Sequence, residues 1–100
     1  MLDVNIRKSG DITTVAISGD LTFSTVGEFV GRVKKHKNVG AMEIAIEELG
    51  ELDLAGLQAL YALRKTRMNS EKTLRFSGED ALQRIDRMTE FAGLPQLREE

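Results

Sequence analysis

The feature that most constrains the fold is a repeated alternation of apolar and polar residues in short segments. Residues 4–7 alternate, and residues 12–18 repeat the pattern after a turn at residues 9–11, which predicts a β-hairpin whose second strand ends at Gly19-Asp20. Residues 42–46 alternate in the same way and predict a third strand, and residues 74–76 predict a fourth. Strands that are covered on both faces are apolar throughout, so alternation predicts helices on one face of the sheet only.

Three segments between and after these strands have helical spacing. The first begins at Thr25, which has the spacing of a capping box with Glu28, and it contains Gly27 and Gly31 on one face. These two glycines predict a weak helix that another backbone could approach closely.

The second helix is expected over residues 54–68, apolar all round and the most buried of the three. The third is expected to start at Ser77 to Asp80, with a stripe at Leu82, Ile85, Met88 and Ala92, and to stop at Gly93 and Pro95. The order β-β-α-β-α-β-α predicts an α/β, two-layer fold with a mixed, mostly parallel four-stranded sheet.

Composition limits the function. The 100 residues are expected to form one domain, residues 1–100 with a core at about 3–94, and Leu97 to Glu100 are expected to fray or to end short. A net charge of −2 argues against nucleic-acid binding, and the absence of cysteine excludes disulfides. No apolar run reaches the length of a signal peptide or a membrane span, so we expect a cytoplasmic protein.

Neither group of charged residues indicates catalysis. His36, the only histidine, lies in a basic run that could bind phosphate or acidic lipid headgroups, but a solvated helix end is the better interpretation. Glu47, Glu48, Glu51 and Asp53 are acidic, but no histidine or phosphate-binding loop accompanies them, so we expect the polar rim of a binding surface and no metal, cofactor or enzyme activity.

The stretch Asp53-Leu54-Ala55-Gly56 opens the second helix and is the best candidate site. The Asp53 carboxylate is expected to cap the helix by accepting hydrogen bonds from amides of the first turn. Gly56 would let another backbone or a partner approach at that turn.

These features together resemble the STAS family of sulfate-transporter and anti-sigma-factor-antagonist domains. The resemblance is carried by the strand order, by Gly19-Asp20-Leu21 and by Asp53-x-Ala55-Gly56-Leu57, and it covers about residues 3–94. It implies a sheet with helices on one face, as the alternation also predicts. In anti-sigma factor antagonists, the residue after this aspartate is a serine or threonine that a partner kinase phosphorylates.

Leu54 occupies that phosphoacceptor position and has no hydroxyl, so the phosphorylation switch cannot operate there. Leu54 could contact a partner or be buried, and the sequence leaves both open. Thr22, Ser24 and Thr25 are the nearest hydroxyls, and capping is the expected role of Thr25. The expected partner-binding residues are Asp20, Thr22, Ser24, Asp53, Leu54, Ala55, Gly56 and Gln58.

The resemblance implies a non-catalytic signalling module that docks a histidine-kinase-like ATPase, either an anti-sigma factor or, because residues 56–60 resemble STAS proteins found beside chemotaxis kinases, a chemotaxis-type kinase. An alternative is a small STAS subunit of a lipid-transporting ABC transporter that binds its ATPase, because residues 53–57 differ at one residue from the Asp-Thr-Ala-Gly-Leu motif of such proteins. A third possibility is nucleotide binding at the start of the second helix, which Asp53 opposes.

Overall fold

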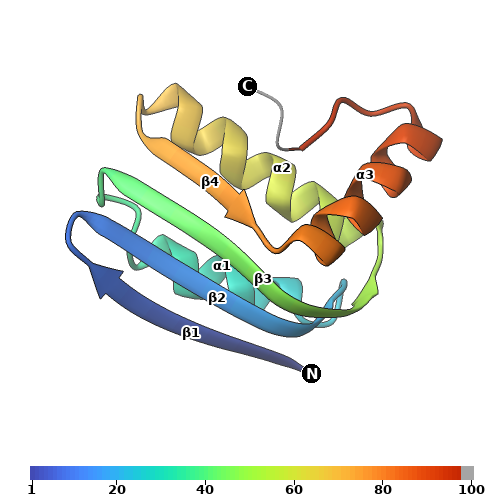
Figure 1. The fold of residues 1–100 in the computed structure, drawn as a ribbon, viewed down its shortest axis with the longest axis horizontal. Helices are drawn as coiled ribbons and strands as arrows, with labels where there is room; N and C mark the ends of the chain where they lie inside the picture. The colour runs from blue at the N-terminus through green and yellow to red at the C-terminus, as the bar shows by residue number, and fades with distance from the viewer. Residues whose placement is uncertain (98–100) are drawn as a thin grey trace.

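The computed structural model describes residues 1–97 and confirms the expected order of elements (Figure 1). The chain forms β1 (Leu2–Ser9), β2 (Ile12–Leu21), α1 (Val26–Lys34), β3 (Ala41–Leu52), α2 (Leu54–Asn69), β4 (Thr73–Ser77) and α3 (Glu79–Ala92). No helix among the described residues is long and apolar enough to cross a membrane.

The four strands form one mixed sheet in the order β1-β2-β3-β4. β1 pairs with β2 in antiparallel fashion, and the pairs β2–β3 and β3–β4 are parallel. The register places Val15 opposite Ile44 and Ile17 opposite Ile46, so the apolar residues of neighbouring strands share one face. This confirms the mixed, mostly parallel sheet.

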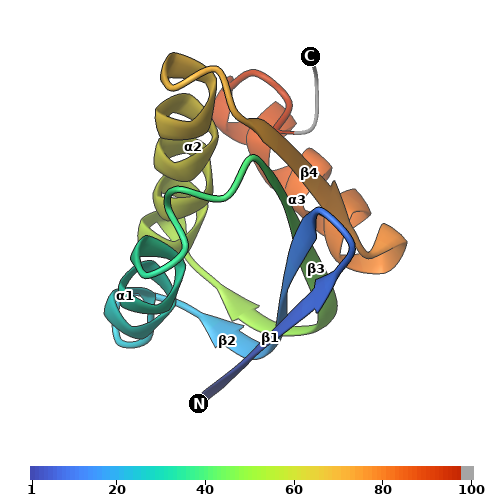
Figure 2. The ribbon, with the colours of Figure 1, turned by 90° about the vertical axis from the view of Figure 1, so that its left-hand side faces the viewer.

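The helices cover only the apolar face. Phe29 of α1, Leu57 of α2 and Ile85 of α3 belong to the same buried cluster as the apolar strand residues. Figure 2 shows α1 and α2 side by side along the concave side of the curled sheet. On the other face most side chains are polar, and Arg7 pairs there with Glu47 at 3.4 Å, across β1 and β3. The two-layer prediction is therefore confirmed.

Two strands are longer than expected. β2 does not end at Gly19-Asp20 but continues to Leu21, and β3 continues through the acidic residues to Leu52. Gly19 has φ of +120°, which glycine tolerates, and the register between β2 and β3 shifts on either side of it. Backbone pairing of Ser18 with Glu48 and of Leu21 with Leu52 maintains the strands where the side chains no longer alternate.

The helices also differ in detail. α2 is not buried all round, because Gln58 and Ala62 are exposed. α3 begins at Glu79, within the expected range, with Gly78 as its N-cap residue. On the expected stripe, Ala92 is exposed, and Thr89 is buried instead. The expected stop of α3 is confirmed, since Gly93 caps it in the left-handed conformation. Gly27 and Gly31 of α1 face open space, so within residues 1–97 no backbone approaches them closely.

The segment after α3 returns to α2. The Tyr61 hydroxyl donates to the carbonyl of Pro95, and Arg64 Nη1 donates to the carbonyls of Gln96 at 2.8 Å and Leu97 at 2.7 Å. Leu97 is fully buried, so the expectation that it frays is wrong. The other residues of that expectation, 98–100, lie outside the described residues.

Candidate functional site

Asp53 joins two segments at the start of α2. It is the N-cap residue, and its Oδ1 accepts a hydrogen bond from the backbone N–H of Gly56 at 3.0 Å, which confirms the expected cap. Its Oδ2 accepts a second from the N–H of Phe23, also at 3.0 Å, in the β2–α1 loop. These backbone donors, Gly56 first and then Phe23, hold the pKa of Asp53 below its ordinary value.

Gly56 allows α2 to start directly against the end of β2. The residue is buried, and a Cβ added to it would overlap the carbonyl oxygen of Leu21. Gly56 was expected to let either another backbone or a partner approach, and in this structure the backbone of the same chain lies against it. Gly56 fixes the position of the first turn of α2 and presents little surface of its own.

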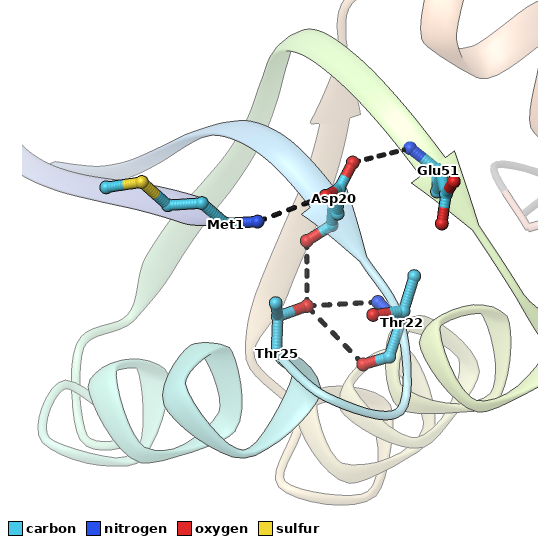
Figure 3. Close-up of polar contacts among 5 residues, drawn as sticks. All are labelled: Met1, Asp20, Thr22, Thr25 and Glu51. Atoms are coloured by element: carbon cyan, nitrogen blue, oxygen red, sulfur yellow. Dashed lines mark hydrogen bonds and ion pairs between the residues drawn. The ribbon is translucent and has the colours of Figure 1, made fainter.

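A second set of hydrogen bonds orders the β2–α1 loop (Figure 3). The Thr25 hydroxyl donates to the carbonyl of Asp20 at 2.7 Å and accepts from the N–H of Thr22 at 3.0 Å. It makes no capping bond to α1, so the expected capping box with Glu28 is wrong: the hydroxyl is already engaged in the loop that precedes the helix.

Asp20 connects this loop to β3. Its Oδ1 accepts from the N–H of Glu51 at 2.8 Å, and its Oδ2 lies 3.0 Å from the amino group of Met1. The hydrogen bond from Glu51, followed by the contact with Met1, lowers the pKa of the Asp20 carboxyl. The two aspartates thus hold the loop and the start of α2 in one arrangement.

Two large apolar side chains are exposed beside these aspartates. Leu54 is 55% exposed, so it is not buried in this structure, and its contact with a partner stays a prediction. Phe23 is 81% exposed, and its backbone is the one that Asp53 binds. Phe23 was not among the site residues expected from the sequence; the signal that could have found it is an aromatic residue within the polar run Thr22-Phe23-Ser24. Ordered and exposed apolar side chains are typical of protein-binding surfaces.

The remaining expected residues surround this pair. Ser24 and Gln58 are exposed, and Thr22 and Ala55 are half-buried. We call the surface formed by the β2–α1 loop and the first turn of α2 the α2 N-terminal surface; it comprises Asp20, Thr22, Phe23, Ser24, Asp53, Leu54, Ala55, Gly56 and Gln58.

A shallow hollow adjoins this surface. It is lined by polar residues of the loop, by Glu51, Leu52 and Asp53, and by Arg84 of α3. Arg84 donates from Nη1 to the carbonyl of Leu49 at 2.7 Å, which fixes the end of β3 that leads to Asp53. Among residues 1–97, no group of three or more acidic or histidine side chains is placed to hold a metal ion.

The sheet order, the helices on one face and the capped start of α2 define a domain of the STAS class. A comparison with protein families matches residues 4–99 to the family described as "Mlab, STAS domain". The chain therefore belongs to this family, and the expected resemblance is confirmed. No curated protein matches the chain.

Solved structures agree on the fold. An anti-sigma factor antagonist from Mycobacterium paratuberculosis aligns with a TM-score of 0.71 and 15% identity, over 95% of this chain and 84% of that one. An uncharacterized protein with a SpoIIAA-like fold from Shewanella loihica aligns with a TM-score of 0.50 and 18% identity, over 92% of this chain and 77% of that one. At these identities, the similarity shows the fold alone.

Proposed function

We propose that this chain is a non-catalytic signalling module of the anti-sigma factor antagonist type that acts in the cytoplasm. Its partner in this proposal is a histidine-kinase-like ATPase, either an anti-sigma factor or a chemotaxis-type kinase, which docks on the α2 N-terminal surface. The observation that carries the proposal is the pair Phe23 and Leu54, exposed on segments that Asp53 ties together.

The order of this surface supports binding. A preorganised loop and helix start lose less conformational entropy when a partner binds than a mobile loop would lose. Leucine at the phosphoacceptor position supports a contact that does not depend on phosphorylation. Regulation would then act through the abundance of the protein, through another partner or through a different hydroxyl, of which Ser24 is the exposed one.

The alternative is a cytoplasmic STAS subunit that binds the ATPase of a lipid-transporting ABC transporter. Two observations favour keeping it: the family that matches is described as "Mlab, STAS domain", and residues 53–57 differ from the motif of such subunits only at Leu54. Both alternatives use the same surface, so the partner distinguishes them.

Affinity purification from the host lysate, followed by mass spectrometry, tests the proposal. The wild type is compared with Leu54→Asp, which places a charge at the phosphoacceptor position, and with Phe91→Ser. Phe91 of α3 is 96% exposed and serves as a matched apolar control away from the α2 N-terminal surface. We expect a histidine-kinase-like ATPase that is retained by the wild type and the control and lost with Leu54→Asp.

A transporter ATPase with the same dependence on Leu54 would support the alternative. Retention of every specific partner by Leu54→Asp would contradict both.

Leu54→Ser provides a second test, because it restores a hydroxyl at the position that the partner kinase of an anti-sigma factor antagonist phosphorylates. If the purified partner is such a kinase, we expect incorporation of phosphate into Leu54→Ser and none into Leu54→Ala. Equal labelling of the two variants would place the phosphate elsewhere and contradict a kinase docked at the start of α2.

A further inference from the structure

A pocket of about 300 Å³ lies at the far end of α2, between the C-terminal halves of α1 and α2. It is lined by the buried side chains Phe29, Val33 and Met42 and by the less buried Val30 and Leu63. This volume is at the lower end of the range found for small-molecule sites. The pocket is therefore large enough for a short apolar chain and too small for a folded partner.

Four cationic side chains line the same pocket. Lys34 and Lys37 come from the end of α1 and the turn after it, and Arg67 and Lys72 from the end of α2 and the loop that follows. Among the described residues that line it, none is acidic. The pocket thus combines an apolar interior with a positively charged surround, an arrangement that attracts an anion with an apolar body.

Arg67 is the most informative of the four. It is only 3% exposed, and its guanidinium donates to the carbonyls of Val39 at 2.8 Å and Thr73 at 2.7 Å. Within residues 1–97 it forms no ion pair with a carboxylate, and its buried Nε has no hydrogen-bond partner. Burial lowers the pKa of Arg67, but an arginine keeps its charge in proteins. A buried charge without a counter-ion is costly, and an anion in the adjoining pocket would reduce that cost.

We propose that this pocket binds a single-chain amphiphile with an anionic head, such as a medium-chain fatty carboxylate. The alkyl chain occupies the space between Phe29, Val33 and Leu63, and the carboxylate faces the cations at the surround. The site is separate from the α2 N-terminal surface, because that surface uses residues 54–58 of α2 and the pocket is lined from Ala62 onward, so the two share no residue. The inference therefore goes beyond the docking function and does not depend on it.

Titration with sodium octanoate, 1-octanol and sodium acetate, all below the concentration at which octanoate aggregates, tests the proposal. Binding is measured by calorimetry and located by ¹H–¹⁵N NMR on the full chain. We expect saturable binding of one octanoate, with shifts concentrated at Val30, Leu63 and Thr66, at least roughly tenfold weaker binding of octanol, and none of acetate. Equal affinity for octanol, or octanoate that does not saturate or shifts other residues, would overturn the proposal.

Variants check that both halves of the pocket contribute. Ala62 is exposed and lines the pocket, so Ala62→Phe fills the space without disturbing the core, and it should abolish octanoate binding. Lys34→Ala combined with Lys37→Ala should weaken binding about tenfold. Lys65→Ala, on the same helix but outside the pocket, is the control and should bind as the wild type does.

Arg67 is left unchanged, since it also holds the backbone together. Wild-type affinity in a folded Ala62→Phe variant would show that the ligand lies elsewhere. An equal loss with Lys65→Ala would show only general attraction to positive charge, and either result would overturn the proposal.

Discussion

The two carboxylate oxygens of Asp53 bind two different segments of the chain. One hydrogen bond stabilises the start of α2, and the other positions the β2–α1 loop of the site. Oδ1 satisfies a first-turn amide of α2, and Oδ2 holds the backbone of Phe23. An asparagine could still accept one of these hydrogen bonds, but its Nδ2 would face an N–H donor. The two hydrogen bonds together therefore require an aspartate at position 53, whereas a helix cap alone would also accept an asparagine.

The free energy of unfolding should show this dependence as a function of pH. The pKa of Asp53 is lower in the folded chain than its ordinary value of about 3.9, so its contribution is complete above that value. The contribution is lost as the pH falls through the lowered pKa. We expect the wild type to be more stable than Asp53→Asn at about pH 6, and the difference, measured by urea denaturation, to shrink towards about pH 2. A difference that grows as the pH falls would contradict this assignment.

The close packing of Gly56 can be tested by an alanine substitution, with a substitution at Gly27 as the control. An alanine at this position would overlap the Leu21 carbonyl, and separating α2 from β2 should cost about 1–3 kcal/mol of the free energy of unfolding. Gly27 is also helical but faces open space, so Gly27→Ala should leave stability unchanged or raise it by up to about 1 kcal/mol. Urea denaturation of both variants measures the contrast, and equal effects would mean that Gly56 is not closely packed.

At the scale of elements, Arg67 joins the end of α2 to two other segments. Besides Val39 and Thr73, its guanidinium donates to Gly40 at 3.2 Å, so one side chain connects the loop before β3 and the start of β4. Arg67→Ala would leave these carbonyls without their donor, and we expect a loss of at least about 2 kcal/mol of the free energy of unfolding. Met68→Ala, at an exposed neighbouring position, should cost much less, and similar losses in thermal or urea denaturation would refute the connecting role.

The start of α2 also allows a prediction about nucleotides. Its first-turn amide is already bonded to Asp53, and a carboxylate at that place repels phosphate. We expect ADP, ATP or inorganic phosphate, each without a divalent cation, to leave the melting temperature unchanged, since only a ligand that binds the folded chain raises it. A saturable rise in the melting temperature would support the nucleotide-binding possibility instead.

The order and type of the elements could be predicted from the sequence because they depend on local periodicity. The hairpin, the helix starting at Leu54 and the stop at Gly93 all follow from side-chain pattern and cap chemistry. The extension of β3 to Leu52 could not be predicted, because it depends on backbone pairing with β2. The role of the Thr25 hydroxyl was missed for a similar reason, since its acceptor, the Asp20 carbonyl, belongs to the end of β2 and not to the helix.

At the scale of the whole molecule, the alternation was sufficient to predict one covered and one open face of the sheet. The candidate site was only partly predictable. Asp53 and Leu54 stand out in the sequence, whereas Phe23 becomes notable only because the fold brings its backbone to Asp53. The apolar pocket between α1 and α2 has no sequence signal, since Lys34 and Lys72 are distant in the chain and meet only through the packing of the two helices.

The α2 N-terminal surface and the pocket use opposite halves of α2 and share no residue, so the two proposals can fail independently. The central claim concerns the α2 N-terminal surface, on which Phe23 and Leu54 project from different segments. If both contact one partner, each should contribute substantially to the binding free energy, as buried apolar anchors do at the centre of an interface.

The most direct test is the affinity of the purified partner for three folded variants: Phe23→Ser, Leu54→Ser and the control Phe91→Ser, measured by calorimetry without ATP. We predict that each of the first two weakens binding about tenfold or more and that the control binds as the wild type does. Unchanged affinity for Phe23→Ser and Leu54→Ser, or an equal loss with Phe91→Ser, would contradict docking at the start of α2.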